Sequence, residues 1–221
     1  MRAWIGNGCI VGLLAAWCAV AGCGQHPARE AVRQGDAAFD AMEFQQALDH
    51  YNRALAADST MAEAYLGRGK IYWLNNQHDL AAPDLDRAIA FRPDLMWAYY
   101  YRGVSRMMLR QFEEGIDDLA TATASGVLPA EDLARAHRFR GIGLMNLERY
   151  EEAVADISSG IAAQPEWPPL YLDRAQLYEA LNQPAQALAD YETYLSFARE
   201  ETDRTAALRE KLAALRAALG Q

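Results

Sequence analysis

A repeated stretch of about 34 residues constrains the fold of this chain more than any other feature. Residues 62–95, AEAYLGRGKIYWLNNQHDLAAPDLDRAIAFRPDL, show it most clearly. Small and bulky residues recur there at a helical spacing, first in one half of the stretch and then in the other, and a proline closes it. In chain order these positions are Tyr65, Gly69, Tyr72, Ala81, Leu85, Ala88 and Pro93. The spacing predicts two successive helices.

Five versions of this stretch follow one another along the chain. Their pattern resembles the tetratricopeptide repeat, in which two antiparallel helices of about 34 residues cross at small side chains and hold bulky ones between them. The resemblance implies an all-α fold, a right-handed α-solenoid of five helix hairpins plus a C-terminal capping helix. We place the repeats in residues 29–201, at about 28–61, 62–95, 96–129, 134–167 and 168–201.

The fourth repeat is expected to begin with a longer helix than the others. The interval from Gly103 to Gly141 is four residues longer than the other intervals, which is close to one helical turn. The extra segment, residues 129–132, would place a proline at the first helical position and acidic residues in the first turn. We therefore expect one additional turn at the N-terminus of this helix.

Residues 202–221 are expected to form the capping helix. Tyr194 stands where earlier repeats have alanine or glycine, which is tolerable only if no sixth repeat follows. A solenoid needs a final helix that covers its last apolar surface. The apolar face of this helix would consist of Leu208, Leu212, Leu215 and Leu219.

The N-terminus has the parts of an export signal. Arg2 precedes an uncharged apolar run, and residues 20–23, Val-Ala-Gly-Cys, resemble a bacterial lipobox. The resemblance implies a signal peptide at residues 1–22, a lipidated Cys23 and a short tether at residues 23–28. Gly24, in place of an aspartate, implies the outer membrane, facing the periplasm. An uncleaved signal anchor is the alternative, since the run is just long enough to span a bilayer.

Composition argues against several classes of function. The chain is 52% hydrophobic with a net charge of -9, and it has no basic block, so we expect an ordered protein that does not bind nucleic acid. With Cys9 and Cys18 in the signal, Cys23 alone remains, which excludes a disulfide or a Cys-ligated metal. No HExxH, GxSxG, P-loop or GxGxxG motif occurs. We expect no enzyme activity and no cofactor or metal, and we interpret His78 and His137 as packing residues.

An arginine and an aspartate recur at fixed places in repeats two to five. Repeat one lacks both and has Gln34 and His50 instead, which suggests that the two residues pair within a repeat. Four copies of one arrangement do not form a catalytic site, so the pair is predicted to be structural. The arginines are Arg68, Arg102, Arg140 and Arg174, and the aspartates are Asp84, Asp118, Asp156 and Asp190.

The family resemblance implies that the first helices line a concave surface. Their exposed positions, read by phase, are unusually apolar and aromatic, which is typical of an interaction site. Such a groove would take a partner's helix or extended segment, with Lys70, Arg135 and Arg138 contacting its acidic groups. Alternatively, tight curvature lets these side chains pack on each other as core. The predicted positions are Phe39, Leu66, Lys70, Trp73, Trp97, Tyr100, Val104, Met107, Arg135, Arg138, Ile142, Met145, Leu172, Gln176 and Glu179.

The sequence therefore predicts a membrane-anchored adaptor that binds another cell-envelope protein and has no chemistry of its own. Tetratricopeptide lipoproteins of this layout serve in pilus or secretion assembly, outer-membrane assembly and related envelope processes. The carboxylate clamp of chaperone-binding members is not matched, because Asp36 stands where an asparagine or lysine is needed. A receptor for a glycan or a peptidoglycan fragment is the alternative function. Self-association through the groove or the last helix is also left open.

Overall fold

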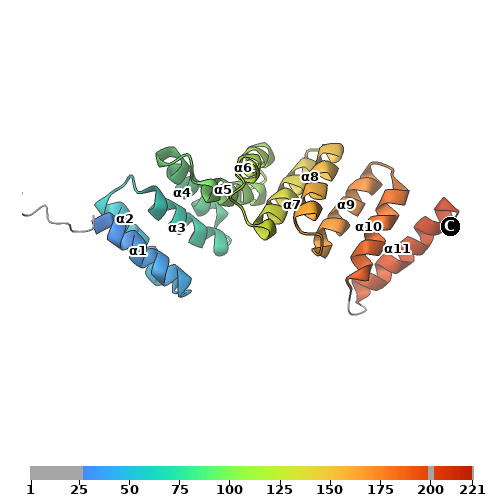
Figure 1. The fold of residues 1–221 in the computed structure, drawn as a ribbon, viewed down its shortest axis with the longest axis horizontal. Coiled ribbons are helices and arrows are strands. Elements are labelled where there is room, and N and C mark those ends of the chain that lie inside the picture. The colour runs from blue at the N-terminus through green and yellow to red at the C-terminus, as the bar shows by residue number, and fades with distance from the viewer. Residues whose placement is uncertain (1–26, 199–201, 221) are drawn as a thin grey trace, which may run out of the picture. The chain divides into compact units, whose positions relative to one another are not determined.

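The structure is a computed structural model that describes residues 27–198 and 202–220. In these residues it contains eleven α-helices and no strand (Figure 1), which confirms the predicted all-α class. The chain divides into two compact units, residues 1–59 and residues 60–221. The predicted signal peptide, Cys23 and nearly all of the tether lie outside the described residues. Among the described helices, none is both long and apolar enough to cross a membrane.

The described residues of unit one form a helix hairpin, α1 (Pro27–Asp40) and α2 (Phe44–Ala57). Tyr51 of α2 is 2% exposed and packs on Gly35 of α1, where an added Cβ would lie 2.6 Å from the tyrosine ring. Its hydroxyl donates a hydrogen bond of 2.8 Å to Asp36. Asp36, at the position of the clamp residue in the resembling family, is thus bonded within its own hairpin.

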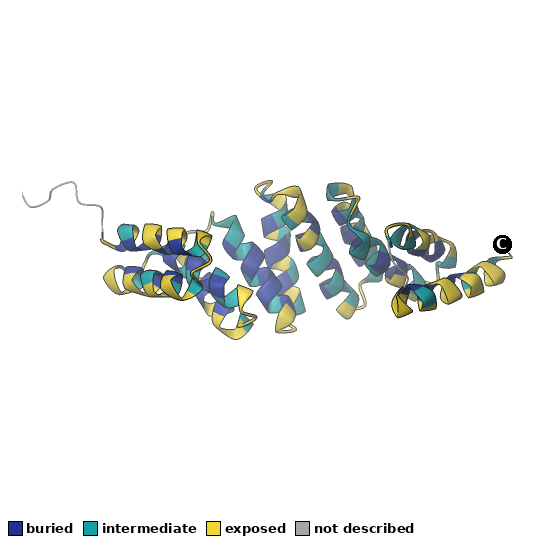
Figure 2. Cartoon of the chain, turned by 90° about the horizontal axis from the view of Figure 1, so that it is seen from below, coloured by how far each residue is buried: buried dark blue, intermediate teal, exposed yellow. Residues whose placement is uncertain are grey.

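The described residues of unit two form four hairpins followed by a single helix. Within it, each helix packs on the one before and the one after it in the chain. Figure 2 shows the buried residues gathered on the faces between helices. The helices are α3 (Ala62–Leu74), α4 (His78–Phe91), α5 (Met96–Met108), α6 (Phe112–Ala124), α7 (Ala130–Asn146), α8 (Tyr150–Ala163), α9 (Pro168–Ala180), α10 (Pro184–Ser196) and α11 (Asp203–Leu219).

The first helices of successive hairpins in unit two also contact each other. These contacts join α3 to α5, α5 to α7 and α7 to α9. No two second helices (α4, α6, α8, α10) come into comparable contact in the described part of unit two. The hairpins are therefore closer together along their first helices, and we call the surface of α3, α5, α7 and α9 that faces away from the second helices the inner wall.

Each hairpin turn contains one residue in the left-handed conformation. These residues have φ between 55° and 62°, and the N–H that follows each of them bonds the carbonyl five residues back, as in Gln111 N to Arg106 O at 2.9 Å. This pattern is the Schellman motif, which satisfies the last carbonyls of a helix and reverses the chain. The five residues are Met42, Asn76, Arg110, Glu148 and Asn182.

Glycines allow the helices to approach closely in the middle of unit two. A Cβ on Gly103 of α5 would lie 2.7 Å from Cγ of Leu119 and 3.1 Å from the carbonyl oxygen of Gly115, both on α6. A Cβ on Gly143 of α7 would lie 2.8 Å from Sδ of Met107. Small residues at the repeat positions are thus required by helix crossing, as the family pattern implies.

Helix α7 has 17 residues, whereas α3, α5 and α9 have 13 each. The additional turn lies at its N-terminus, where Glu131 and Asp132 occupy the first turn. The predicted lengthening is confirmed, with one correction. Pro129 is the N-cap residue, and the helix begins at Ala130.

The last helix, α11, covers the end of the repeat array as predicted. Leu208 and Leu212 are buried against α10, and Leu215 and Leu219 are partly buried in the same cluster. Thr202 and Thr205 form a capping box at its N-terminus. The helix therefore has a defined start and supplies the apolar side chains that cover α10.

Candidate protein-binding face

The predicted arginine–aspartate pairs are confirmed in all four hairpins of unit two. In each pair both aspartate oxygens accept a hydrogen bond from the guanidinium, and the aspartate side chains are 3–11% exposed. Hydrogen bonding to Asp84 raises the pKa of Arg68 above its usual value. The Nε–Oδ2 distances are 2.6 Å for Arg68–Asp84, 2.8 Å for Arg102–Asp118, 2.6 Å for Arg140–Asp156 and 2.7 Å for Arg174–Asp190.

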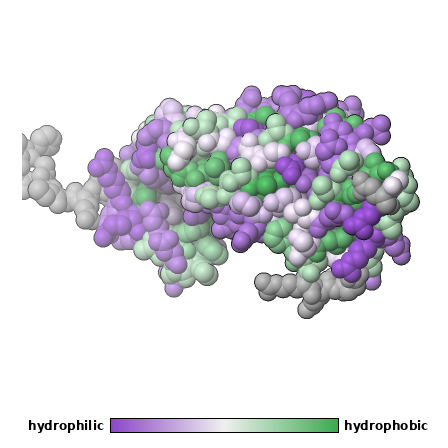
Figure 3. Space-filling view, turned by 45° about the vertical axis from the view of Figure 1, so that its right-hand side comes forward, coloured by the Kyte–Doolittle hydropathy of each residue, from purple (hydrophilic) through white to green (hydrophobic). Residues whose placement is uncertain are grey.

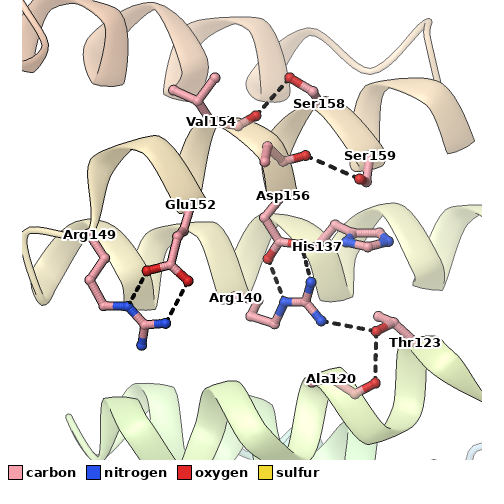
Figure 4. Close-up of polar contacts among 11 residues, drawn as sticks. Ala120, Thr123, His137, Arg140, Arg149, Glu152, Val154, Asp156, Ser158 and Ser159 are labelled. Carbon is pink, nitrogen blue, oxygen red and sulfur yellow. Dashed lines mark hydrogen bonds and ion pairs between the residues drawn. The ribbon is translucent and has the colours of Figure 1, made fainter.

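Three of these arginines also bond the second helix of the preceding hairpin, which the sequence analysis did not predict. Arg102 donates to Asp86 at 2.7 Å. Arg140 donates to Thr123 at 3.2 Å (Figure 4), and Arg174 donates to Ser158 at 2.9 Å. Each guanidinium thus joins three helices and fixes the register of two hairpins. These guanidinium groups are thus engaged in structural bonds within and between hairpins.

Four aromatic rings form a cluster on the inner wall between α3 and α5. Trp73 and Tyr101 have ring centroids 5.0 Å apart, and Trp97 lies 5.7 Å from Tyr101 and 5.6 Å from Tyr100. The two tyrosines are buried, and burial raises the pKa of Tyr101 to about 12. Trp73 and Trp97 are only partly buried. The cluster therefore presents two indole rings on a support of buried tyrosines. In Figure 3, hydrophobic and hydrophilic residues are interspersed in patches over the visible surface.

Some of the predicted groove residues are core residues, as the alternative interpretation held. Tyr100 and Val104 are 2% exposed and Met107 is 6% exposed, so the expectation that they line an open surface was wrong. Met107 extends toward α7, where Gly143 makes room for its thioether, and Tyr100 packs against Trp97 and Tyr101. Leu172 is buried as well.

The other predicted positions on the inner wall reach the surface to different degrees. Arg135 and Gln176 are exposed. Phe39 belongs to unit one, where it is partly buried and packs edge-on against Phe44 at 5.4 Å. The remaining positions in unit two are partly buried, namely Leu66, Lys70, Trp73, Trp97, Arg138, Ile142, Met145 and Glu179.

The two arginines predicted to contact a partner's acidic groups already have acidic neighbours. Arg138 donates to Asp173 of α9 at 2.5 Å, and its guanidinium lies 5.6 Å from the ring centroid of Trp167. Burial raises the pKa of Asp173, although Arg138 acts in the opposite direction. Arg135 pairs with Glu131 one turn earlier on α7. A partner's carboxylate would therefore have to compete with these ion pairs.

The two histidines singled out in the sequence have packing roles. Nδ1 of His137 lies 2.8 Å from Oδ1 of Asp156, beside the Arg140 pair (Figure 4). His78 lies 3.4 Å from the hydroxyl of Ser105, and burial lowers its pKa. In the described part of the chain, no three His, Cys, Asp or Glu residues come together in a group that could hold a metal ion.

Comparison with known proteins agrees with this architecture. Models of the tetratricopeptide repeat match residues 32–95 and residues 168–201. A TPR repeat-containing thioredoxin of Arabidopsis thaliana, TDX, is 30% identical over 80 residues, which cover 36% of this chain. The matched part spans only about a fifth of that relative, 21% of its length.

Three solved structures of similar fold are each under 25% identical to this chain, so they bear on the fold alone. YrrB, described as a TPR protein with an unusual peptide-binding site, has a TM-score of 0.73 at 20% identity over 83% of this chain and 92% of its own. MamA has a TM-score of 0.69 at 21% identity, over 78% of this chain and 92% of its own. PilF of Pseudomonas aeruginosa has a TM-score of 0.69 at 16% identity, over 86% of this chain and 84% of its own. With these family matches, and with five helix hairpins followed by a last helix in the described residues, the chain contains tetratricopeptide repeats.

Proposed function

We propose that this protein is a non-enzymatic scaffold that binds a segment of another protein on the inner wall of unit two. The observation that carries the proposal is the aromatic cluster, in which Trp73 and Trp97 remain partly exposed over buried Tyr100 and Tyr101. Tryptophan on a rigid support offers a large contact area at little entropic cost, which is why it is enriched at binding hot spots. The peptide-binding site described for YrrB supports the same use of this fold.

The neighbouring positions on the inner wall suit a protein segment better than a sugar. Ile142 and Met145 of α7 and Leu66 of α3 are partly buried apolar side chains, and methionine adapts its shape to different partners. A glycan would need several polar groups to replace its hydrogen bonds with water. The arginines nearest to this surface are engaged with Asp173 and Glu131. An apolar or amphipathic segment is therefore the proposed ligand, and a glycan is the alternative that the experiment below also tests.

We further propose that the protein is anchored to the outer membrane by lipid on Cys23 and that its partner is an envelope protein. The sequence of residues 20–23 supports this part of the proposal. Cells that express the full chain or its Cys23→Ser variant would be fed an alkyne analogue of palmitate. Labelling and membrane fractionation of the native chain, with loss of both in the variant, is the expected result. Equal labelling of the two proteins would contradict the anchor.

Photocrosslinking tests the binding face itself. Benzoylphenylalanine placed at Trp97 in the full chain is expected to capture one protein, and the matched control places it at Leu80, a 45% exposed apolar residue of the second helix α4. Equal capture from both positions would refute an inner-wall site. Capture abolished by added muropeptides would favour the glycan receptor.

A further inference from the structure

Unit two contains a small cavity at the turn ends of α3 and α5. Its volume is about 200 Å³, and its mouth is flanked by Leu74 and Met108, which are 42% and 49% exposed. In the described part of the chain, no other residue buries these two large apolar side chains. The remaining walls come from Trp73, Asn76, His78, Val104 and Phe139.

The walls of this cavity are mostly apolar and carry no charged side chain at neutral pH. Val104, Phe139 and the indole of Trp73 belong to the lining, and burial lowers the pKa of His78, which keeps its imidazole neutral. A charged group entering the cavity would lose its hydration without gaining an opposite charge. The volume is also below the roughly 300–1,000 Å³ that is usual for a whole small-molecule ligand. One uncharged apolar side chain fits both restrictions.

The cavity adjoins the aromatic cluster, because Trp73 belongs to both. The Trp73 ring lies 5.0 Å from the ring of Tyr101, centroid to centroid, and Trp73 also forms a wall of the cavity. Its indole Nε1 is buried, with no hydrogen-bond partner among the described residues. No hydrogen bond among the described residues therefore fixes the indole of Trp73. Asn76, which also lines the cavity, is the left-handed residue of a Schellman turn.

We propose that this cavity is an anchor pocket for one uncharged apolar side chain, aliphatic or aromatic, of the partner segment that lies on the inner wall. The inference rests on the proposed function and names the chemistry of the segment. The cluster of Trp73 and Trp97 contacts the body of the segment, and the pocket at the turn end fixes its register through a single residue.

Two adjacent positions at the end of α5 provide a matched test in the full chain. Met108 lines the cavity, whereas the next residue, Leu109, is 38% exposed and does not. Met108→Lys introduces a charge at the mouth and is expected to reduce capture from the crosslinker at Trp97 at least tenfold. Leu109→Lys adds the same charge beside the cavity and is expected to leave capture unchanged. Both sites are exposed, so the fold tolerates either lysine.

Benzoylphenylalanine at Met108 provides the second measurement. Mass spectrometry is expected to find it joined to an apolar residue of the same partner, and changing that partner residue to aspartate is expected to abolish capture at Trp97. If Trp97 captures a partner and Met108→Lys has no effect, or if position 108 joins a charged residue, the pocket is overturned and the proposed function stands. If position 108 captures a segment and Trp97 does not, the inner-wall function is overturned. Capture at neither position overturns both.

Discussion

The arginine–aspartate pairs allow a quantitative prediction, because two of them differ in how many arginines contact the aspartate. Asp118 accepts bonds from Arg102 and also from Arg106 at 2.8 Å, and its side chain is 5% exposed. Asp190 is equally buried at 7%, and Arg174 is its arginine partner in the described residues. Removal of one member of a buried pair typically costs about 3–5 kcal/mol, because the other charge is left without compensation.

Arg106 changes the expected coupling energy between the members of the first pair. In Arg102→Ala, Asp118 keeps Arg106 as a partner, so we expect a loss of about 1–2 kcal/mol. In Arg174→Ala, Asp190 loses its guanidinium, and we expect a loss of about 3 kcal/mol or more. Double-mutant cycles with alanine should therefore give a coupling of about 1 kcal/mol for Arg102–Asp118 and about 2–3 kcal/mol for Arg174–Asp190.

Urea unfolding followed by circular dichroism at 222 nm measures these differences. Each variant must keep the m-value of the native chain, since a change would show that a part of the array unfolds separately. Adding Arg106→Ala to the first cycle should raise its coupling to the level of the second. Equal couplings at both pairs without that change would refute the idea that Arg106 shares Asp118. Couplings near zero at both pairs would refute the structural role itself.

Three further predictions concern the packing, the turns and the buried tyrosines. Gly103→Ala should destabilise the fold by about 1–3 kcal/mol, because the new Cβ would lie 2.7 Å from Leu119. Gly160→Ala should cost less, because the atom nearest to its new Cβ is 3.2 Å away. Thermal and urea unfolding measure the difference in stability between the two variants. Glu148→Gly should stabilise by about 0.5–1 kcal/mol by relieving a left-handed residue, and Asn182→Gly should change little. Because the pKa of Tyr101 is raised, its contribution to stability is complete below about pH 10 and is lost as the pH rises toward about 12. Alkaline unfolding of a Tyr101→Phe variant should therefore show a weaker loss of stability over that range.

The hairpins were predictable because their determinants are local in sequence. The small residues at Gly69 and Gly103, the extra turn before Ala134 and the leucines of α11 all follow from spacing within one or two helices. The arginine–aspartate pairs were predictable for a related reason. Both members are missing from the first repeat, and their positions lie within one hairpin, where the antiparallel geometry brings them together.

The inner wall was predicted less well, because its exposure depends on how closely neighbouring hairpins approach. Phase along α5 identifies the face that carries Tyr100, Val104 and Met107, but it does not reveal that Gly143 lets α7 come near enough to cover Met107. The bond from Arg102 to Asp86 and the cavity beside Met108 have the same origin. Each depends on distances between helices of different hairpins, which a repeat pattern does not contain. The signal peptide and Cys23 stay predictions.

The absence of close packing among α4, α6, α8 and α10 in the described part of unit two has a mechanical consequence. In such an array the first helices of successive hairpins contact each other and the second helices do not. We therefore expect it to bend about the line of first helices. A change in curvature therefore separates no pair of second helices, and the strain falls on the interfaces of α4 with α5, α6 with α7 and α8 with α9 and on the arginine bonds that cross them. Bending of this kind adapts the inner wall to ligands of different width while every hairpin stays intact.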